Sequence, residues 1–272
     1  HNDGTTIMYD FYGYEIGYGT PAPSSGFLLS GYHNESLPDP WLKYRLNAEY
    51  WFDRWCTLTT GISAPTPTTI SSYVSNPKYE LFYEMAHGNY QLFQATSTLC
   101  YYSSDVTNDM KGRSPMKFAF IGSCDGMNNT GLGSFSYEFR KGQMTDTVTV
   151  GFNGMGSCPG SSVAFEWQDF MFNKIDEGFT IKESFDLASA EFPTIADCVV
   201  FVGDENLKVQ SKSRESSATT KPLLLRLAER FPNMFPILKQ MLGLLNKIIS
   251  LPFLNPQKEE TNPSNTFSLF LV

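Results

Sequence analysis

The chain has 272 residues, of which 41% are hydrophobic and 15% aromatic, so it can form one large α/β domain with an appendage, or two small domains. Its 28 Asp and Glu residues outnumber 20 Lys and Arg residues, and the resulting net charge of -8 without a basic stripe argues against nucleic acid as the main partner. The five cysteines are widely spaced and form no Cys-x-x-Cys pair, which argues against a structural zinc site.

Residues 1–65 are predicted to be the N-terminal part of the domain. Gly, Tyr, Pro and Ser dominate its beginning, where only the apolar run at Phe27 resembles a strand. An Asp-Pro pair at residues 39–40 starts a helix that apolar spacing extends to about residue 56. Gly and Pro residues between 61 and 67 then break the chain. Because no clear first strand is found, we expect this part to be truncated or divergent.

Strand-like runs alternate with helical patterns through residues 66–210, which we predict to be the core of the domain. The expected core strands are 79–86, the apolar run from 117 to 122, 147–152 and 198–202, with shorter strands near 91–93 and 99–102. The expected helices begin near residues 68, 103, 134, 161 and 180, the last with a Thr-x-x-Glu capping box. This alternation predicts an α/β fold, a mainly parallel sheet with helices on both faces.

The composition changes after the core. A polar, Ser-rich stretch at 211–221 is predicted to be a linker. Residues 222–254 are strongly apolar, but prolines and basic residues interrupt them before the roughly 20 residues needed to cross a bilayer. We expect an amphipathic helical extension there, which packs on the domain, on a partner or flat on a membrane surface. Residues 255–272 are expected to form a loose tail.

Two core strands end on residues that carry chemistry. Strand 79–86 is followed by His87 and Gly88, and the next core strand runs into Ser-Cys-Asp-Gly around Cys124. Because reactive groups gather at the carboxyl ends of strands in open α/β sheets, we expect the imidazole and the thiol to share one cleft. An imidazole that takes up the thiol proton makes cysteine a strong nucleophile near neutral pH. The N–H groups of Gly88 and Cys124 are the expected oxyanion hole.

Simpler explanations exist for the same residues. A cysteine at a strand end is more often a small buried hydrophobe than a nucleophile. A His-Gly pair is common. The chain has only three histidines, however, and His1 and His33 lie in loop-like sequence, which favours His87 as the functional one. Cys158, in a Gly-rich turn, is expected to form a disulfide or to have a structural role in its loop.

The order of apolar strand, His-Gly, crossover, apolar strand and Ser-Cys-Asp-Gly resembles the clan CD cysteine peptidases, which include caspases, legumains, clostripain, gingipains and CHAT domains. Residues 131–140 resemble the helix that follows the nucleophile in that clan. The strand 147–151 and the helix after Ser161 resemble the next strand and helix, and 198–209 is similar to the closing strand of gingipain-like peptidases. The resemblance covers about residues 66–209 and points to the gingipain, clostripain and CHAT-type branch.

The resemblance implies a caspase-like fold and a cysteine endopeptidase that works through an acyl-enzyme. Cys124 would be the nucleophile and His87 the acid/base that assists attack and protonates the leaving amine. The N–H of Gly88 would help to hold the oxyanion. The turn around Phe152 and Asn153 would form one wall of the pocket for the P1 side chain.

The P1 preference stays open. Asp125 is the nearest acidic residue for a basic P1 side chain, and it can equally cap the segment that follows Cys124. Gly122 stands where several arginine-specific relatives carry an acid.

The resemblance also implies a peptide or protein substrate and chemistry without a cofactor or metal, although calcium activates some relatives. Sequons at Asn34 and Asn128 and the low lysine content indicate an extracellular or cell-surface protein. Two alternatives are open. One is a catalytically inactive caspase-like module that serves as a binding or structural protein of the cell surface. The other is a thiol acyltransferase or transpeptidase.

Overall fold

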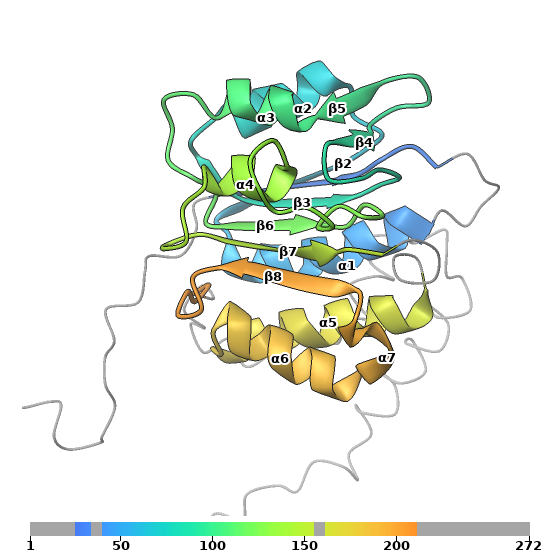
Figure 1. Cartoon of the computed structure of the whole chain (residues 1–272), viewed down its shortest axis with the longest axis vertical. Helices are drawn as coiled ribbons and strands as arrows, with labels where there is room; N and C mark the ends of the chain where they lie inside the picture. The colour runs from blue at the N-terminus through green and yellow to red at the C-terminus, as the bar shows by residue number, and fades with distance from the viewer. Residues whose placement is uncertain (1–24, 34–39, 155–160, 211–272) are drawn as a thin grey trace, which may run out of the picture. The chain divides into compact units, whose positions relative to one another are not determined.

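The computed structural model describes residues 25–33, 40–154 and 161–210 (Figure 1). They build a six-stranded sheet with the order β2-β1-β3-β6-β7-β8 and a two-stranded hairpin. The neighbouring strands of the large sheet are parallel except for the last pair, β7 and β8. Their bounds are β1 Ser25–Ser30, β2 Leu58–Ser63, β3 Tyr79–Met85, β6 Phe118–Ile121, β7 Val148–Phe152 and β8 Val199–Gly203. The predicted mainly parallel sheet is confirmed.

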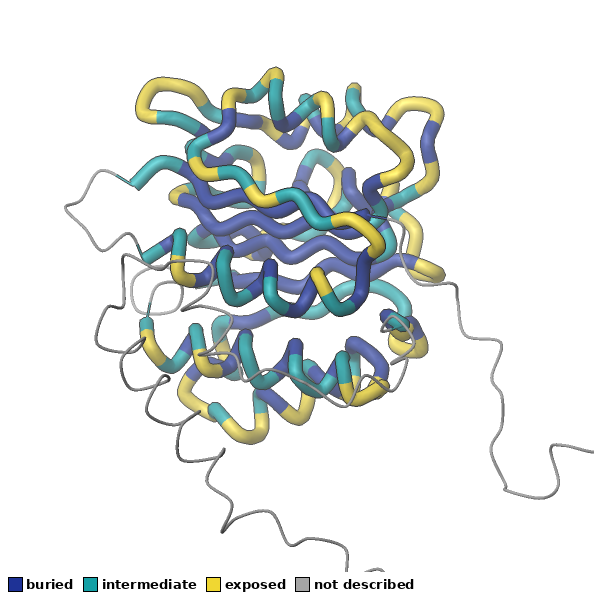
Figure 2. Tube along the Cα trace, turned by 180° about the vertical axis from the view of Figure 1, so that it is seen from behind, coloured by how far each residue is buried: buried dark blue, intermediate teal, exposed yellow. Residues whose placement is uncertain are grey.

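Helices cover both faces of the sheet, as predicted (Figure 1). One face carries α1 (Pro40–Trp55), α5 (Ser162–Glu177), α6 (Ile181–Glu191) and the short α7 (Pro193–Ala196). The other face carries α2 (Pro67–Val74), α3 (Ser103–Asp109) and α4 (Phe135–Arg140), beside the hairpin of β4 (Leu92–Gln94) and β5 (Cys100–Tyr102). Because the strands alternate their side chains between two apolar layers, the sheet itself is buried along its centre (Figure 2).

The helices begin and end where the sequence supplies caps. The Ser161 hydroxyl accepts from the Ala164 N–H at 3.0 Å at the start of α5, and Gly178 ends that helix with φ of 100°. The Thr180 hydroxyl and the Glu183 carboxylate form the predicted capping box of α6, with bonds of 3.0 and 2.8 Å. These local signals explain why the helix positions could be read from the sequence.

A polar contact fastens α1 to α5 on one face of the sheet. The Asp169 carboxylate accepts from Asn47 Nδ2 at 2.6 Å and from Trp51 Nε1 at 2.9 Å. Deeper in the same layer, the buried Tyr83 hydroxyl of β3 donates to Gln168 Oε1 at 2.8 Å. The two helices are therefore fixed to each other and to the sheet by hydrogen bonds within an apolar core.

The part before residue 66 differs from the prediction. β1 and β2 belong to the same sheet as the later strands, with β1 between β2 and β3, so the first strands are present and the boundary at 65/66 separates no two parts of the sheet. Residues 61–63 of the expected chain break instead belong to the polar edge strand β2, and the break itself is limited to residues 64–66 before α2. Gly61 of β2 packs so close to α1 that a Cβ would overlap the Glu49 carboxylate. Apolar periodicity does not reveal a strand of this kind.

Other expectations fall outside the described residues: the linker 211–221, the helical extension 222–254, the tail 255–272 and the role of Cys158. Cys198 is disulfide-bonded, whereas Cys56, Cys100 and Cys124 are not. In the part of the chain that the structure describes, no helix has the length and apolar character needed to span a bilayer.

Candidate active site

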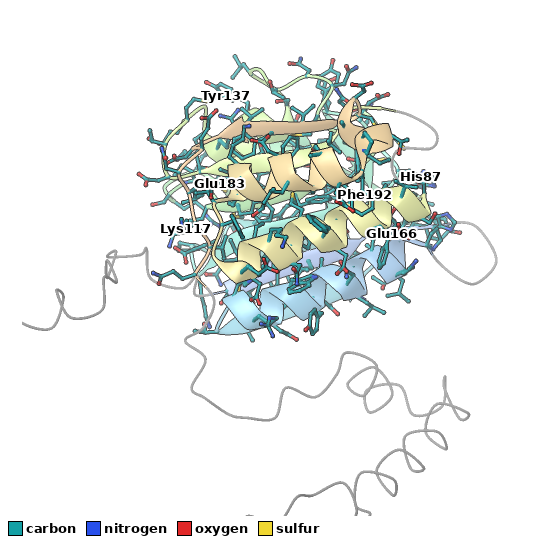
Figure 3. The ribbon with its side chains drawn as sticks, turned by 90° about the horizontal axis from the view of Figure 1, so that it is seen from below. His87, Lys117, Tyr137, Glu166, Glu183 and Phe192 are labelled. Atoms are coloured by element: carbon teal, nitrogen blue, oxygen red, sulfur yellow. The ribbon has the colours of Figure 1, made fainter. Side chains whose placement is uncertain are left out.

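His87 and Cys124 leave the sheet at the same end, from neighbouring parallel strands. In the register of β3 and β6, Glu84 lies opposite Ile121, and each candidate residue stands three positions beyond its member of this pair. Figure 3 shows His87 at the end of the molecule opposite Lys117, which precedes β6. His87 is exposed and Cys124 is half-buried. The structure thus brings the two predicted residues to one edge of the sheet.

The turn after β3 is held against the β4 hairpin. The carbonyl of His87 accepts from Gln94 N at 2.7 Å, and the N–H of Asn89 donates to Leu92 O at 2.8 Å. A Cβ on Gly88 would lie 2.4 Å from Leu92 O, so glycine is required for this close approach. Among the described backbone hydrogen bonds, the Gly88 N–H donates to none. It is the kind of donor that an oxyanion needs.

His87 belongs to a cluster of three rings that the sequence did not reveal. Its imidazole stacks on that of His33, with centroids 5.6 Å apart and an interplanar angle of 15°. Trp41 of α1 meets both imidazoles edge-on, with both centroid distances at 5.3 Å. His33 follows β1, the strand beside β3, so three chain segments that are distant in sequence converge here. The contacts fix the position of the His87 ring.

The turn after β6 is tight and fastened to the end of β7. The Gly126 N–H donates to the Ser123 carbonyl at 3.0 Å and closes the turn around Cys124. Asp125 adopts a left-handed conformation with φ of 52°, an uncommon state that aspartate tolerates better than most residues. The Asp125 N–H donates to Gly154 O at 3.3 Å. The thiol is therefore presented by an ordered turn.

The two residues predicted to form one wall of the P1 pocket, Phe152 and Asn153, differ in their burial. The side chain of Phe152 is fully buried and packs on Phe120 and Trp167, with centroid distances of 5.8 and 6.0 Å. It contributes a backbone carbonyl to the turn, which accepts from Met127 N at 2.7 Å. Asn153 is half-buried at the end of β7. Only Asn153 of this pair therefore has a side chain near the surface.

The carboxylate of Asp125 has no hydrogen-bond partner among the described residues. The segment that follows Cys124 is closed by backbone bonds instead, including one from the Asn128 N–H to the Asp125 carbonyl at 3.1 Å. The side chain of Asp125 thus does not cap this segment, and it lies half-buried beside the thiol.

Glu84, a residue that the sequence reading passed over, lies in β3 and contacts the Cys124 turn. Its side chain is 1% exposed, and its Oε1 accepts from the N–H of Ser123 at 2.9 Å and from the hydroxyl of Ser123 at 2.7 Å. Burial raises the pKa of this carboxyl from 4.5 to about 7, and the hydrogen bonds from Ser123 and Gly122 oppose that change. A carboxylate between the apolar residues Phe82 and Ala86, on the face of β3 that packs against the helices, is the signal that could have revealed it.

The surroundings of the Cys124 thiol favour its protonated form. Burial raises its pKa above the ordinary value of 9.0, its own N–H lowers it, and the carboxylates of Glu84 and Asp125 raise it further. The site therefore holds no preformed thiolate, and a base has to remove the proton when the sulfur attacks.

No metal cluster marks this end of the sheet among the described residues. No group of three or more His, Cys, Asp and Glu side chains within the described ranges is arranged to hold a metal ion. Two pockets lie elsewhere, one of about 300 Å³ lined by α5 residues and Phe192, and one of about 360 Å³ between the β4–β5 hairpin and Gly133. Neither is lined by His87 or Cys124.

The sequence matches no protein-family model, and it matches no curated protein. Among solved structures, the chain is similar to pro-Sf-caspase-1, with 10% sequence identity and a TM-score of 0.45. That alignment covers 69% of this chain and 94% of the other. The fold described above stands on its own strand order and connections.

Proposed function

We propose that the chain is a caspase-like cysteine endopeptidase with Cys124 as nucleophile and His87 as acid/base. The observation that carries the proposal is their placement, three positions beyond a registered residue pair on adjacent parallel strands. The Gly88 turn supports it, because it leaves a backbone donor next to His87. The gingipain, clostripain and CHAT-type branch is part of this proposal and rests on the sequence motifs alone.

The chemistry starts from a neutral thiol. As the sulfur of Cys124 attacks the substrate carbonyl carbon, its proton passes to the His87 imidazole. The N–H groups of Gly88 and Cys124 stabilise the negative oxygen of the tetrahedral intermediate. When the intermediate collapses, the C–N bond breaks and His87 gives its proton to the leaving amine. The acyl group is then held on Cys124 as a thioester. His87 takes a proton from water as the water oxygen attacks the thioester carbon, and it returns that proton to the sulfur as the C–S bond breaks.

The P1 pocket is proposed between the Cys124 turn and the end of β7, with Asn153 and the backbone at Phe152 on one side. Asp125 favours a basic P1 side chain, because its half-buried carboxylate has no partner among the described residues. A carboxylate beside the nucleophile would favour lysine or arginine at P1 over neutral residues.

The remaining expectations stay proposals. A peptide or protein is the partner, and residues 222–254 are proposed to contact a membrane surface or another protein. The location is proposed to be outside the cell or on its surface, which the disulfide of Cys198 supports because such bonds persist in oxidising compartments. Thiol chemistry needs no cofactor, and added calcium tests whether the activity depends on that ion.

Peptide acyloxymethyl ketones that differ at P1 test the function. The wild-type chain, Cys124→Ala and His87→Ala are treated under reducing conditions, with and without calcium, and the labelled residue is located by mass spectrometry. We expect labelling at Cys124 that depends on His87 and favours a basic P1 residue. Cys100, a second partly exposed free thiol, is the internal control for non-specific alkylation. Labelling of Cys100 and Cys124 to the same extent, or of neither, contradicts the peptidase.

The raised pKa of the Cys124 thiol favours a second candidate, an inactive module that keeps the fold as a binding surface. Such a module would show no labelling that depends on His87. An acyltransferase or transpeptidase would show the same labelling as a peptidase, but its products would be joined peptides. Product analysis after incubation with a peptide and a free amine separates these two.

A further inference from the structure

Glu84 is the buried ionisable group closest to the proposed chemistry that the mechanism does not use. Its side chain lies in β3 on the same side of the sheet as Phe82 and Ala86, facing the layer with α2, α3 and α4. A carboxyl without a cation partner is costly in such a place, and an apolar residue would pack there without that cost. Its presence calls for a reason other than stability.

The contacts of Glu84 lead directly to the nucleophile. Oε1 accepts both hydrogen bonds that Ser123 can donate, from the N–H at 2.9 Å and from the hydroxyl at 2.7 Å. Ser123 is fully buried, it precedes Cys124, and its carbonyl accepts from the Gly126 N–H that closes the turn. One carboxyl oxygen on β3 thus holds the first residue of the turn that presents the thiol.

The second oxygen, Oε2, is buried and has no hydrogen-bond partner among the described residues. The charged groups around it do not neutralise it. Arg113, a buried cation on the α2 side, donates to carbonyls of Val74 and Tyr79, near the beginning of β3. Glu138 of α4 accepts from the Gly133 N–H. The titratable neighbours at this end of the strands are Cys124, Asp125, His87 and His33, which stacks on His87.

We propose that Glu84 is a positioning residue of the active site, whose buried carboxyl fixes the Cys124 turn through Ser123. Its charge has a second effect, because a carboxylate near a thiol opposes formation of the thiolate. Below about pH 7 the carboxyl is protonated and this opposition is absent, and above it the opposition is present. The inference gives Glu84 a role within the proposed function, but its effect on the thiol is measurable without any peptidase activity.

Alkylation of Cys124 by iodoacetamide between about pH 5 and pH 10 tests the electrostatic part, with each cysteine resolved by mass spectrometry. In the wild-type protein we expect an inflection near pH 7 in addition to that of the thiol itself. In Glu84→Gln the inflection disappears and Cys124 is alkylated several-fold faster in the alkaline range. Glu80→Gln is the matched control, because Glu80 lies on the same strand but pairs with Lys117 at 3.0 Å near the surface. It should leave the Cys124 profile unchanged.

Steady-state hydrolysis of the preferred peptide tests the positioning part. Gln keeps an acceptor for Ser123, so Glu84→Gln should retain kcat, whereas Glu84→Leu should lose at least about tenfold in kcat with little change in KM. Ser123→Ala, which removes one of the two bonds, should fall between them. If Glu84→Leu does not fold, Ser123→Ala still tests the positioning part, because it removes the hydroxyl bond to Glu84 and leaves the carboxyl in place.

Three results would overturn the inference: a folded Glu84→Leu variant that keeps the wild-type kcat, a wild-type profile without the inflection near pH 7, or a Glu84→Gln profile that superimposes on the wild type. Failure of the proposed function looks different. In that case the acyloxymethyl ketones do not label the wild-type Cys124, while the iodoacetamide profiles still differ between wild type and Glu84→Gln.

Discussion

Replacing Glu84 with glutamine should change how the stability of the protein depends on pH. The pKa of this carboxyl is 4.5 ordinarily and about 7 in the folded protein, so the folded state binds the proton more tightly than the unfolded chain. Its contribution to stability is therefore fully present below about pH 4.5 and is lost as the pH rises through about 7. At about 1.4 kcal/mol for each pKa unit, the loss amounts to about 3 kcal/mol. The amide side chain of the Glu84→Gln variant cannot ionise, so the variant escapes this loss.

Urea unfolding of both proteins between about pH 5 and pH 9 measures the effect, because all other titrating groups act equally on both and cancel in the difference. We expect the free energy of unfolding of Glu84→Gln, relative to wild type, to rise by about 3 kcal/mol across this range. The amide Nε2 replaces the unpartnered Oε2 and adds a cost that does not vary with pH. A difference that stays constant with pH would refute the assignment of a buried, titrating carboxyl.

Three further substitutions test the fold and the His87 turn. Phe172→Ala empties a fully buried site in the core and should lower the free energy of unfolding by about 3–5 kcal/mol in urea titrations. Thr180→Ala removes the capping box of α6 and should cost about 1 kcal/mol, while leaving alkylation of Cys124 unchanged. Gly88→Ala places a Cβ 2.4 Å from a β4 carbonyl and should slow ketone labelling of Cys124, whereas Gly131→Ala, with its nearest contact at 3.3 Å, should not. Equal labelling rates in these last two variants would contradict the tight turn at Gly88.

Much of the fold could be predicted because its signals are local. The runs that became β3, β6, β7 and β8 are apolar and bounded by turn residues, and most helices begin at a side chain that caps them. The placement of His87 and Cys124 followed from the same reasoning, since adjacent parallel strands end at one edge. No distance information was needed for that step.

The missed features depend on contacts that are distant in sequence. β2 is a polar strand at the edge of the described sheet, where it pairs with β1, and it shows no apolar periodicity. His33 lies in loop-like sequence and acquires a role only because β1 lies beside β3. Glu84 is one of two glutamates in β3, and its role depends on Ser123, which follows another strand. A sequence pattern records none of these pairings.

The place of β1 inside the sheet limits how the protein can be shortened. A fragment that begins at residue 66 would lack both β1 and β2. The edge of β3 that pairs with β1 would then have no strand partner. Phe27, Leu28 and Leu29, which are almost completely buried, would be missing from both layers at once. Such a fragment would present an open, apolar strand edge to other copies of itself and should precipitate. Any minimal version of the protein has to include β1 and therefore to begin no later than Ser25.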